Sequence, residues 1–148
     1  MGAITDFDKS LLLRPDHPLT LNNRAYTKRK SGDLEGALQD LNTGLILEPL
    51  NVFMLNNRAI TKHLLGNREQ ALLDLNLALT LHLEEPDAGY NTACANSLLG
   101  HFEIALDWLA QAISKDKKFL AMARTDSDFD DIRDDPRFMA LVGEGEQP

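Results

Sequence analysis

Cysteine is nearly absent from this sequence, and so are long apolar runs. The one cysteine, Cys94, cannot form an internal disulfide. No run of about eighteen apolar residues is present, as a membrane-spanning helix would require. The first residues do not show the basic and then apolar pattern of a secretory signal. Together these absences predict a cytoplasmic protein in a reducing compartment that does not enter the membrane.

Excess positive charge is also absent. The formal net charge is −8, and from Phe119 onward there are eight acidic residues against three basic ones. Nonspecific binding to nucleic acid depends on cationic surface that displaces counterions from phosphates. The charge therefore argues against a nucleic-acid partner.

Metal-binding patterns are lacking as well. The histidines show no HxxxH or HExxH spacing, so no zinc site is expected. Alternating acids at Asp126, Asp128 and Asp130 resemble the start of a calcium loop. Such a loop needs glycine at its sixth position and glutamate at its twelfth, and this chain has Asp131 and Arg137 there. We expect a solvated capping segment, with no metal and no cofactor.

No catalytic constellation stands out. Cys94 and His63 are the one pair whose chemistry could be nucleophilic, and no orienting acid or oxyanion donor accompanies them. The glycines lie at the turns between helices and do not form a phosphate-binding loop. We therefore expect that the chain is not an enzyme.

What the sequence does contain is a 34-residue repeat. Residues 18–51 and 52–85 are identical at sixteen of 34 positions, including the shared "LNNRA", and residues 86–119 match the second unit at ten. Chance would give about two matches. A sustained period of this length indicates an array of supersecondary units.

Each unit has the pattern of two helices. The first helix has a small residue at its middle and stops at Gly32, Gly66 or Gly100, where glycine can adopt the left-handed conformation. The second has apolar residues at helical spacing. In the second helices of the three units, alanines at 37, 71 and 105 would allow neighbouring helices to approach closely. Leucines at 41, 75 and 109 would fill the space between units. Pro49 closes the first unit.

These residues resemble the tetratricopeptide (TPR) repeat, a 34-residue helix–turn–helix. The resemblance implies an all-α fold, a right-handed superhelical solenoid of antiparallel helix pairs with C-terminal capping helices. The implied organisation is the second helix of a truncated repeat at 1–17, repeats at 18–51 and 52–85, a degenerate repeat at 86–119, and a cap and tail at 120–148.

The opening residues follow the same period, since six of them match residues 34 positions later, among them Asp6/Asp40 and Pro15/Pro49. The chain thus starts at the second helix of a repeat. Two explanations stay open: a piece of a longer protein, or a natural start in which a lone helix caps the array. If the chain is cut, one apolar face of this helix would normally meet a partner helix, and once exposed it could pair with a second copy. This face consists of Ile4, Phe7, Leu11 and Leu12.

The last thirty residues leave the period. We predict a helix over about 118–124, a short helical turn around 129–133 and a final helix at 136–142. Asp135 before Pro136 is a good helix start, an acidic cap followed by proline at the first helical position. The block "DSDFDDIRDDPRF" is similar to the closing segment of many bacterial TPR proteins, where it covers the open end of the array.

Function follows from the first helices, which line the concave face in the TPR architecture. Asn23, Asn57 and Asn91 recur at one position, and an amide side chain can both donate to and accept from a peptide backbone. This resembles the asparagine ladder of peptide-binding TPR domains. The alternative is that the asparagines satisfy inter-repeat groups or face water. The expected peptide-binding residues are Asn22, Asn23, Tyr26, Arg29, Lys30, Phe53, Asn56, Asn57, Ile60, His63, Tyr90, Asn91 and Cys94.

Two arginines next to these asparagines have a different expected role. Arg24 and Arg58 occupy a usually apolar position, and we expect their stems to pack while each guanidinium reaches solvent or an acid in the adjacent helix. The favoured function is a protein–protein interaction module that binds an extended peptide, with Arg29 and Lys30 favouring an acidic end. The alternative is a structural spacer or self-association module that dimerises through the N-terminal helix.

Overall fold

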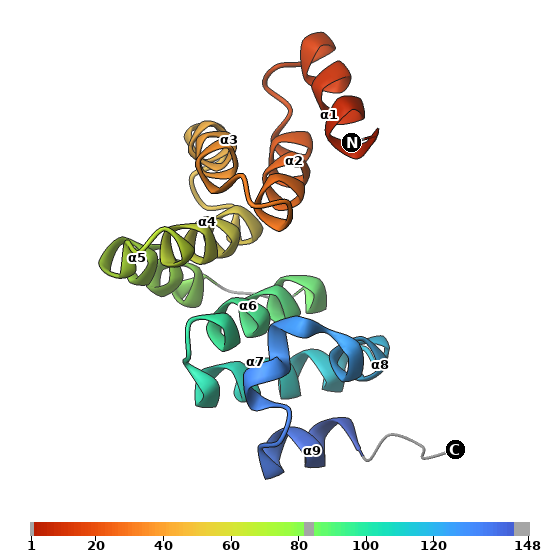
Figure 1. Ribbon diagram of the computed structural model, residues 1–148. Coiled ribbons are helices and arrows are strands. Elements are labelled where there is room, and N and C mark those ends of the chain that lie inside the picture. Colours follow the sequence, from red (N-terminus) through yellow and green to blue (C-terminus); the bar gives the residue numbers. More distant parts are fainter. Residues whose placement is uncertain (1, 82–84, 144–148) are drawn as a thin grey trace. The chain divides into compact units, whose positions relative to one another are not determined.

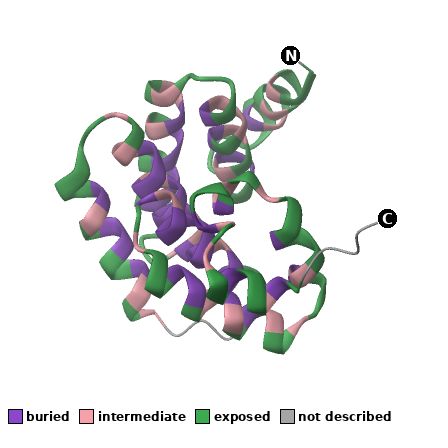
Figure 2. Cartoon of the chain, turned by 60° about the horizontal axis from the view of Figure 1, so that its bottom comes forward, coloured by how far each residue is buried: buried purple, intermediate pink, exposed green. Residues whose placement is uncertain are grey.

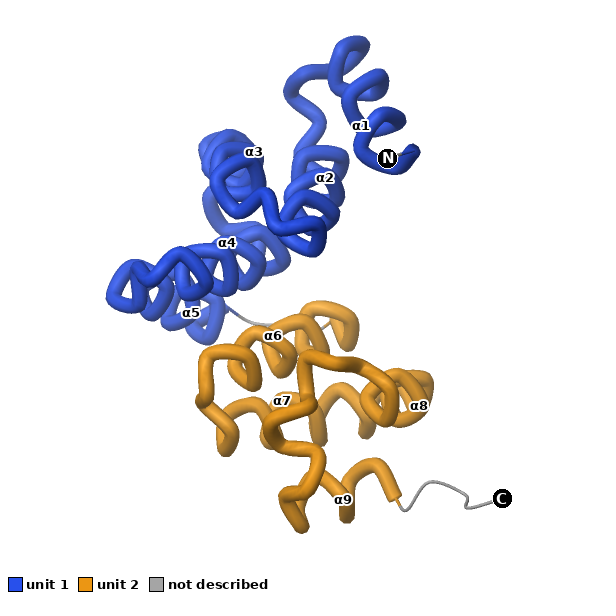
Figure 3. Tube along the Cα trace, in the orientation of Figure 1, with its two compact units in different colours: residues 1–81 blue, residues 82–148 orange. Residues whose placement is uncertain are grey.

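The chain is all-α in the computed structural model, which describes residues 2–81 and 85–143. No strand occurs within these ranges. The chain divides into two compact units, residues 1–81 and 82–148 (Figure 3). We describe each unit by itself.

Unit 1 is a stack of antiparallel helices (Figure 1). Helix α1 packs on α2, α2 pairs with α3, α3 packs on α4, and α4 pairs with α5. The bounds are α1 Gly2–Leu13, α2 Pro18–Lys30, α3 Leu34–Leu47, α4 Val52–Leu64 and α5 Arg68–Thr80. The first helices of the expected pairs are thus α2 and α4, and the second helices are α3 and α5.

Unit 2 begins with a third helix pair, α6 and α7, which is followed by shorter elements. The bounds are α6 Pro86–Leu98, α7 Phe102–Lys115, α8 Lys118–Thr125, the 3-10 helix η1 Ser127–Ile132, and α9 Pro136–Val142. Helix η1 packs on α6, and α8 and α9 contact α7 and each other. The three helical segments expected after residue 117 are confirmed.

The turns between paired helices form as the glycine pattern predicts. Gly32, Gly66 and Gly100 have φ values of 94°, 86° and 84°, a conformation that side chains with a Cβ rarely adopt. The start of α9 is also confirmed, because the Asp135 carboxylate accepts a hydrogen bond from the Arg137 amide at 2.8 Å with Pro136 at the first helical position.

The core follows the repeat pattern. The alanines at 37, 71 and 105 and the leucines at 41, 75 and 109 are all buried, and they lie on the inner faces of the second helices. Figure 2 shows the buried residues as stripes along the helices. In unit 2 the core is richer in aromatic rings: Phe119 stacks on Tyr90 with centroids 4.8 Å apart, and Phe129 lies 5.7 Å from Phe138.

Among the described residues, no helix is both long enough and apolar enough to cross a bilayer.

Candidate functional site

Unit 1 has a hollow where the start of α2 meets the start of α4. Its volume is about 430 Å³, and we call it the α2–α4 hollow. The floor includes Met54, which is buried, and the rim includes Leu19, which is 63% exposed. The complete lining is His17, Pro18, Leu19, Asn22, Asn23, Glu48, Asn51, Phe53 and Met54. An apolar floor with amide groups at its rim can accept one apolar side chain and hold the backbone beside it.

Asn23 is the exposed amide of this hollow. Neighbouring polar groups already have partners: Asn51 accepts from the Met54 amide and donates to Glu48, and His17 caps α2 through Thr20. Because Asn23 is not used in such a cap, both its donor and its acceptor can serve a ligand.

Asn57 lies further in. It is 5% exposed, and its Nδ2 donates to Asn22 Oδ1 at 2.9 Å, a bond that joins α4 to α2. The two equivalent asparagines of unit 1 thus differ, since Asn23 faces outward and Asn57 holds the helices together. Asn91 is in unit 2, so unit 1 contributes two of the three expected ladder positions.

An exposed stripe continues along α2 beyond the hollow. Leu19, Asn23, Tyr26 and Lys30 follow one another at three- and four-residue spacing, and all four are exposed. Lys30 Nζ lies 5.6 Å from the centre of the Tyr26 ring, and Cζ of the buried Arg29 lies 5.2 Å from it. The end of α2 therefore presents an aromatic ring among cations.

The remaining expected residues of α4 are less accessible. Asn56 and Ile60 are buried, while Phe53 and His63 are partly exposed. Asn56 is fully buried, so its amide cannot reach a peptide on the α2 face. Only Phe53 among these also lines the hollow.

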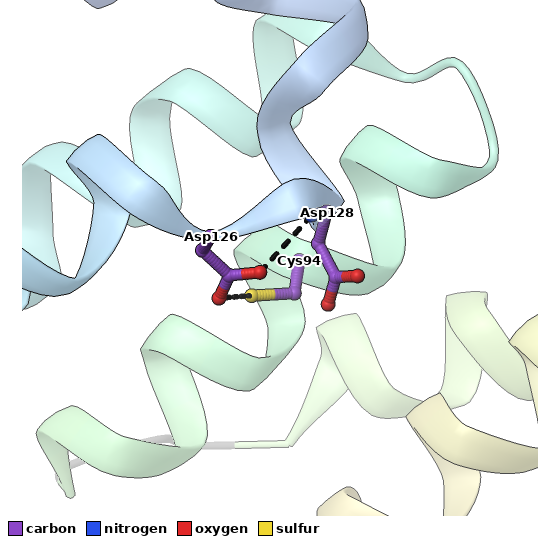
Figure 4. A group of neighbouring side chains, drawn as sticks. All are labelled: Cys94, Asp126 and Asp128. Carbon is purple, nitrogen blue, oxygen red and sulfur yellow. Dashed lines mark hydrogen bonds between the residues drawn. The ribbon is translucent and has the colours of Figure 1, made fainter. Parts of the chain in front are cut away.

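In unit 2, Tyr90 and Cys94 are covered by the C-terminal segment. The Tyr90 hydroxyl donates to Asp126 Oδ2 at 2.8 Å, and Cys94 Sγ lies 3.8 Å from the same oxygen (Figure 4). Burial raises the pKa of the Cys94 thiol, and the nearby Asp126 and Asp128 raise it further. Burial likewise raises the pKa of Tyr90. Neither side chain is available to a peptide in this arrangement, so we leave both out of the proposed surface.

Cys94, Asp126 and Asp128 bring their ligand atoms within 4.8 Å of one another. Metal binding would require the thiolate, which the raised pKa of Cys94 disfavours. The Asp126 carboxylate is also already bonded, since its Oδ1 accepts from the Asp128 amide at the start of η1. Asp126 in this cluster therefore caps η1 and also accepts the hydrogen bond of the Tyr90 hydroxyl.

The expected role of the two arginines is confirmed. Arg24 contacts Asp40 with both Nε and Nη2, at 2.8 and 2.6 Å. Arg58 makes the same two contacts with Asp74, at 2.7 and 2.6 Å. The hydrogen bond with Asp40 raises the pKa of Arg24.

Sequence reasoning did not identify six members of the site. Asp126 covers Tyr90 and Cys94. The other five line the hollow: His17, Pro18, Glu48, Asn51 and Met54. Glu48 and Met54 flank the turn between α3 and α4, and hollows at such turns could have been expected from the repeat itself. Asp126 lies outside the repeat, so the period carried no signal for its contact.

Comparison with known proteins identifies the fold. No protein-family model matches this chain, and no curated protein matches it. Among solved structures, the crystal structure of MamA, a TPR-like protein, matches with a TM-score of 0.55. The match covers 95% of this chain and 83% of that chain at 18% identity. This chain is therefore all-α, with a structural neighbour of the TPR-like helical solenoid type.

Proposed function

We propose that this chain is a non-catalytic protein-interaction module whose α2 face in unit 1 binds an extended segment of a partner protein. The single observation that carries the proposal is the α2–α4 hollow with the exposed Asn23 amide at its rim. A TPR-like fold supports a role as a protein-interaction scaffold.

The chemistry of the stripe suggests what the segment carries. One apolar side chain of the partner would enter the hollow over Met54. The side-chain amide of Asn23 would donate a hydrogen bond to the adjacent peptide backbone and accept one from it. Lys30 lies eleven residues after Leu19, which is about 16 Å along the helix. An extended peptide covers that distance in about five residues. An acidic residue about five positions from the apolar one would then reach Lys30 and Tyr26.

The experiment begins with a peptide-display selection against the wild-type chain. The affinity of each selected peptide is then measured for Asn23→Ala and for a matched control, Asn76→Ala, which removes an exposed asparagine from α5. We expect Asn23→Ala to weaken binding about tenfold, because it removes two backbone hydrogen bonds of about 0.5–1.5 kcal/mol each. The control should bind as the wild type does. Equal loss in both variants, or no loss in either, would exclude Asn23 as a binding group.

A second candidate function is self-association through α1. The observation in its favour is that Leu12 and Leu13 are 84% and 85% exposed. Leu11, in contrast, is buried within unit 1, and Ile4 and Phe7 are partly buried. A molar mass that rises with concentration in the wild type and stays monomeric in Leu12→Ser would support it; a constant mass in both would remove it.

A further inference from the structure

The α2–α4 hollow carries charge of one sign. Its described lining residues include one acidic residue, Glu48, and no lysine or arginine. His17 is the other ionisable residue of the lining, and its Nδ1 accepts a hydrogen bond from the Thr20 amide at the start of α2. The hollow is therefore an apolar cavity with a single carboxylate at its rim.

The Glu48 carboxylate is accessible and only partly used. Glu48 is exposed, and its Oε2 accepts a hydrogen bond from Asn51 Nδ2 at 2.7 Å. Within residues 2–81 and 85–143, no lysine or arginine forms an ion pair with it. The buried acids of unit 1 differ, since Asp40 and Asp74 each bind two cations. Because a carboxylate accepts several hydrogen bonds, Glu48 can still bind a cation of a ligand.

The two ends of the α2 face carry opposite charges. Glu48 follows the last residue of α3, and it lines the hollow together with the first residues of α2. Lys30 is the last residue of α2, at the far end of the exposed stripe. A peptide that lies along α2 thus meets a carboxylate beside the hollow and a cation beside Tyr26.

We propose that the partner segment carries a lysine or arginine about two positions from the apolar residue that enters the hollow, on the side away from Lys30, and that Glu48 selects it. This inference rests on the proposed function, because it assumes that an extended segment lies on the α2 face. Side chains two residues apart in an extended peptide point the same way and lie about 6–7 Å apart. The apolar side chain then contacts Met54 while the basic one reaches the rim.

Charge complementarity is the reason for this choice of partner. A carboxylate at the rim attracts a cation and repels an acidic side chain, so it discriminates between segments even where it adds little affinity. Together with Lys30, it sets the order of charges along the segment. The basic residue lies at the start of α2 and the acidic residue at its end.

Parallel peptide selections test whether Glu48 sets this preference. Short random peptides are selected against the wild-type chain, against Glu48→Lys, and against a matched control, Glu35→Lys, which makes the same charge change at an exposed residue in the first turn of α3. Circular dichroism establishes that all three proteins are folded. We expect the wild type and Glu35→Lys to enrich a basic residue about two positions from the apolar one. Glu48→Lys should enrich an acidic residue at that position.

A double-mutant cycle measures the contact itself. One selected peptide is synthesised with lysine and with glutamine at the basic position, and each is titrated by fluorescence anisotropy against the wild type and Glu48→Gln. Glutamine keeps a side-chain oxygen for the bond from Asn51. We expect either single change to weaken binding about threefold to fivefold at low ionic strength, and the second change to add little. The difference should shrink as salt is added, because the pair is exposed.

Three results would overturn the inference. One is a selection in which no basic residue is enriched, or in which Glu48→Lys keeps the wild-type preference. Another is a pair of losses that add in the double-mutant cycle. The third is a molar mass that rises with concentration in the wild type and stays monomeric in Glu48→Gln, which would make a second copy the occupant.

Asn23→Ala separates a failure of this inference from a failure of the proposed function. Peptides that lose affinity in Asn23→Ala but not in Glu48→Gln would overturn the role of Glu48 alone. Peptides that lose affinity in Glu48→Gln but not in Asn23→Ala would exclude Asn23 and support the role of Glu48. A wild-type chain that selects no peptide would overturn both.

Discussion

The helix pairs of unit 1 and the pair that opens unit 2 share a 34-residue spacing but are held together differently. In unit 1, a buried aspartate in each second helix binds an arginine and a lysine of the first helix. In unit 2 the equivalent positions hold Thr92, Asn96 and Trp108. The repeat therefore fixes where helices meet, while the chemistry of the contact can change completely.

A compensating exchange makes the change possible. Gly89 occupies the position of Leu21 and Leu55, which are buried in unit 1. A Cβ at Gly89 would lie 3.6 Å from the Trp108 ring, so the indole covers the space that a leucine fills elsewhere. Unit 2 thus replaces a leucine and an aspartate by a glycine and a tryptophan, and aromatic packing replaces ionic contact.

The largest effect is expected from the aromatic core of unit 2. Phe129 is fully buried between Tyr90 and Phe138, so Phe129→Ala removes ring contacts and leaves a cavity. We expect a loss of about 3–5 kcal/mol in the free energy of unfolding. Trp108 is the only tryptophan and lies in unit 2, so its fluorescence reports on this unit. Met139→Ala, at a 45% exposed position, is the control and should cost about 0.5 kcal/mol or less. Equal losses in Phe129→Ala and Met139→Ala would contradict the claim that the aromatic core stabilises unit 2.

A somewhat smaller effect is expected from the ionic contact of unit 1. Asp74→Ala would leave Arg58 and Lys62 without their shared carboxylate, and both side chains are mostly buried. Because the two cations keep some contact with solvent, we expect Asp74→Ala to lower the free energy of unfolding by about 2–3 kcal/mol. This loss is smaller than that for a fully buried ion pair. Urea unfolding followed by circular dichroism measures the change, with the exposed Asp16→Ala as control. A change under 0.5 kcal/mol would mean that the ion pairs do not stabilise the stack.

Alkaline pH should weaken unit 2. The pKa values of Tyr90 and Cys94 are raised from their ordinary 10.0 and 9.0, so the folded state retains protons that the unfolded state releases. Their contribution to stability is complete below about pH 9 and declines as the pH rises further. Tyr90→Phe should flatten the decline above pH 10 in unfolding curves followed by Trp108 fluorescence. An unchanged slope would show that burial does not hold the proton on the Tyr90 hydroxyl.

The smallest effect is expected at the start of α9. The hydrogen bond from Arg137 lowers the pKa of Asp135, so the ionised cap stabilises the folded state above the ordinary pKa of 3.8. That contribution is lost as the pH falls through the lowered folded-state value. Asp135→Asn keeps a capping side chain but removes the charge, and should reduce the acid sensitivity of unit 2 slightly. If the stability of Asp135→Asn fell more steeply with decreasing pH than that of the wild type, this prediction would be wrong.

Most of the fold could be predicted because the repeat places one type of residue at one structural position. Gly32, Gly66 and Gly100 give the turns, and the cap at Asp135 gives the start of α9. The site could be predicted only in part. Periodicity assigns Asn23 and Asn57 to the same face, but the bond from Asn57 to Asn22 depends on how α4 approaches α2.

The inaccessible site residues have a common physical cause. Tyr90 and Cys94 occupy groove positions by the repeat, yet they are covered by Asp126 and its neighbours from a segment outside the period. Sequence spacing identifies the face of a helix and does not identify what packs on that face. The partners of a terminal repeat are therefore the least predictable part of such a chain.

The most direct test of the account is to locate a selected peptide on the chain by NMR. Side-chain amide resonances of asparagine are followed during a titration of the uniformly ¹⁵N-labelled protein, with Asn23→Ala used to assign its pair of signals. If Asn23 binds the peptide backbone, its side-chain signals shift with the same saturation curve as the peptide's binding, while those of Asn76 on α5 do not move. Shifts confined to unit 2, with the Asn23 signals unchanged at saturation, would contradict it.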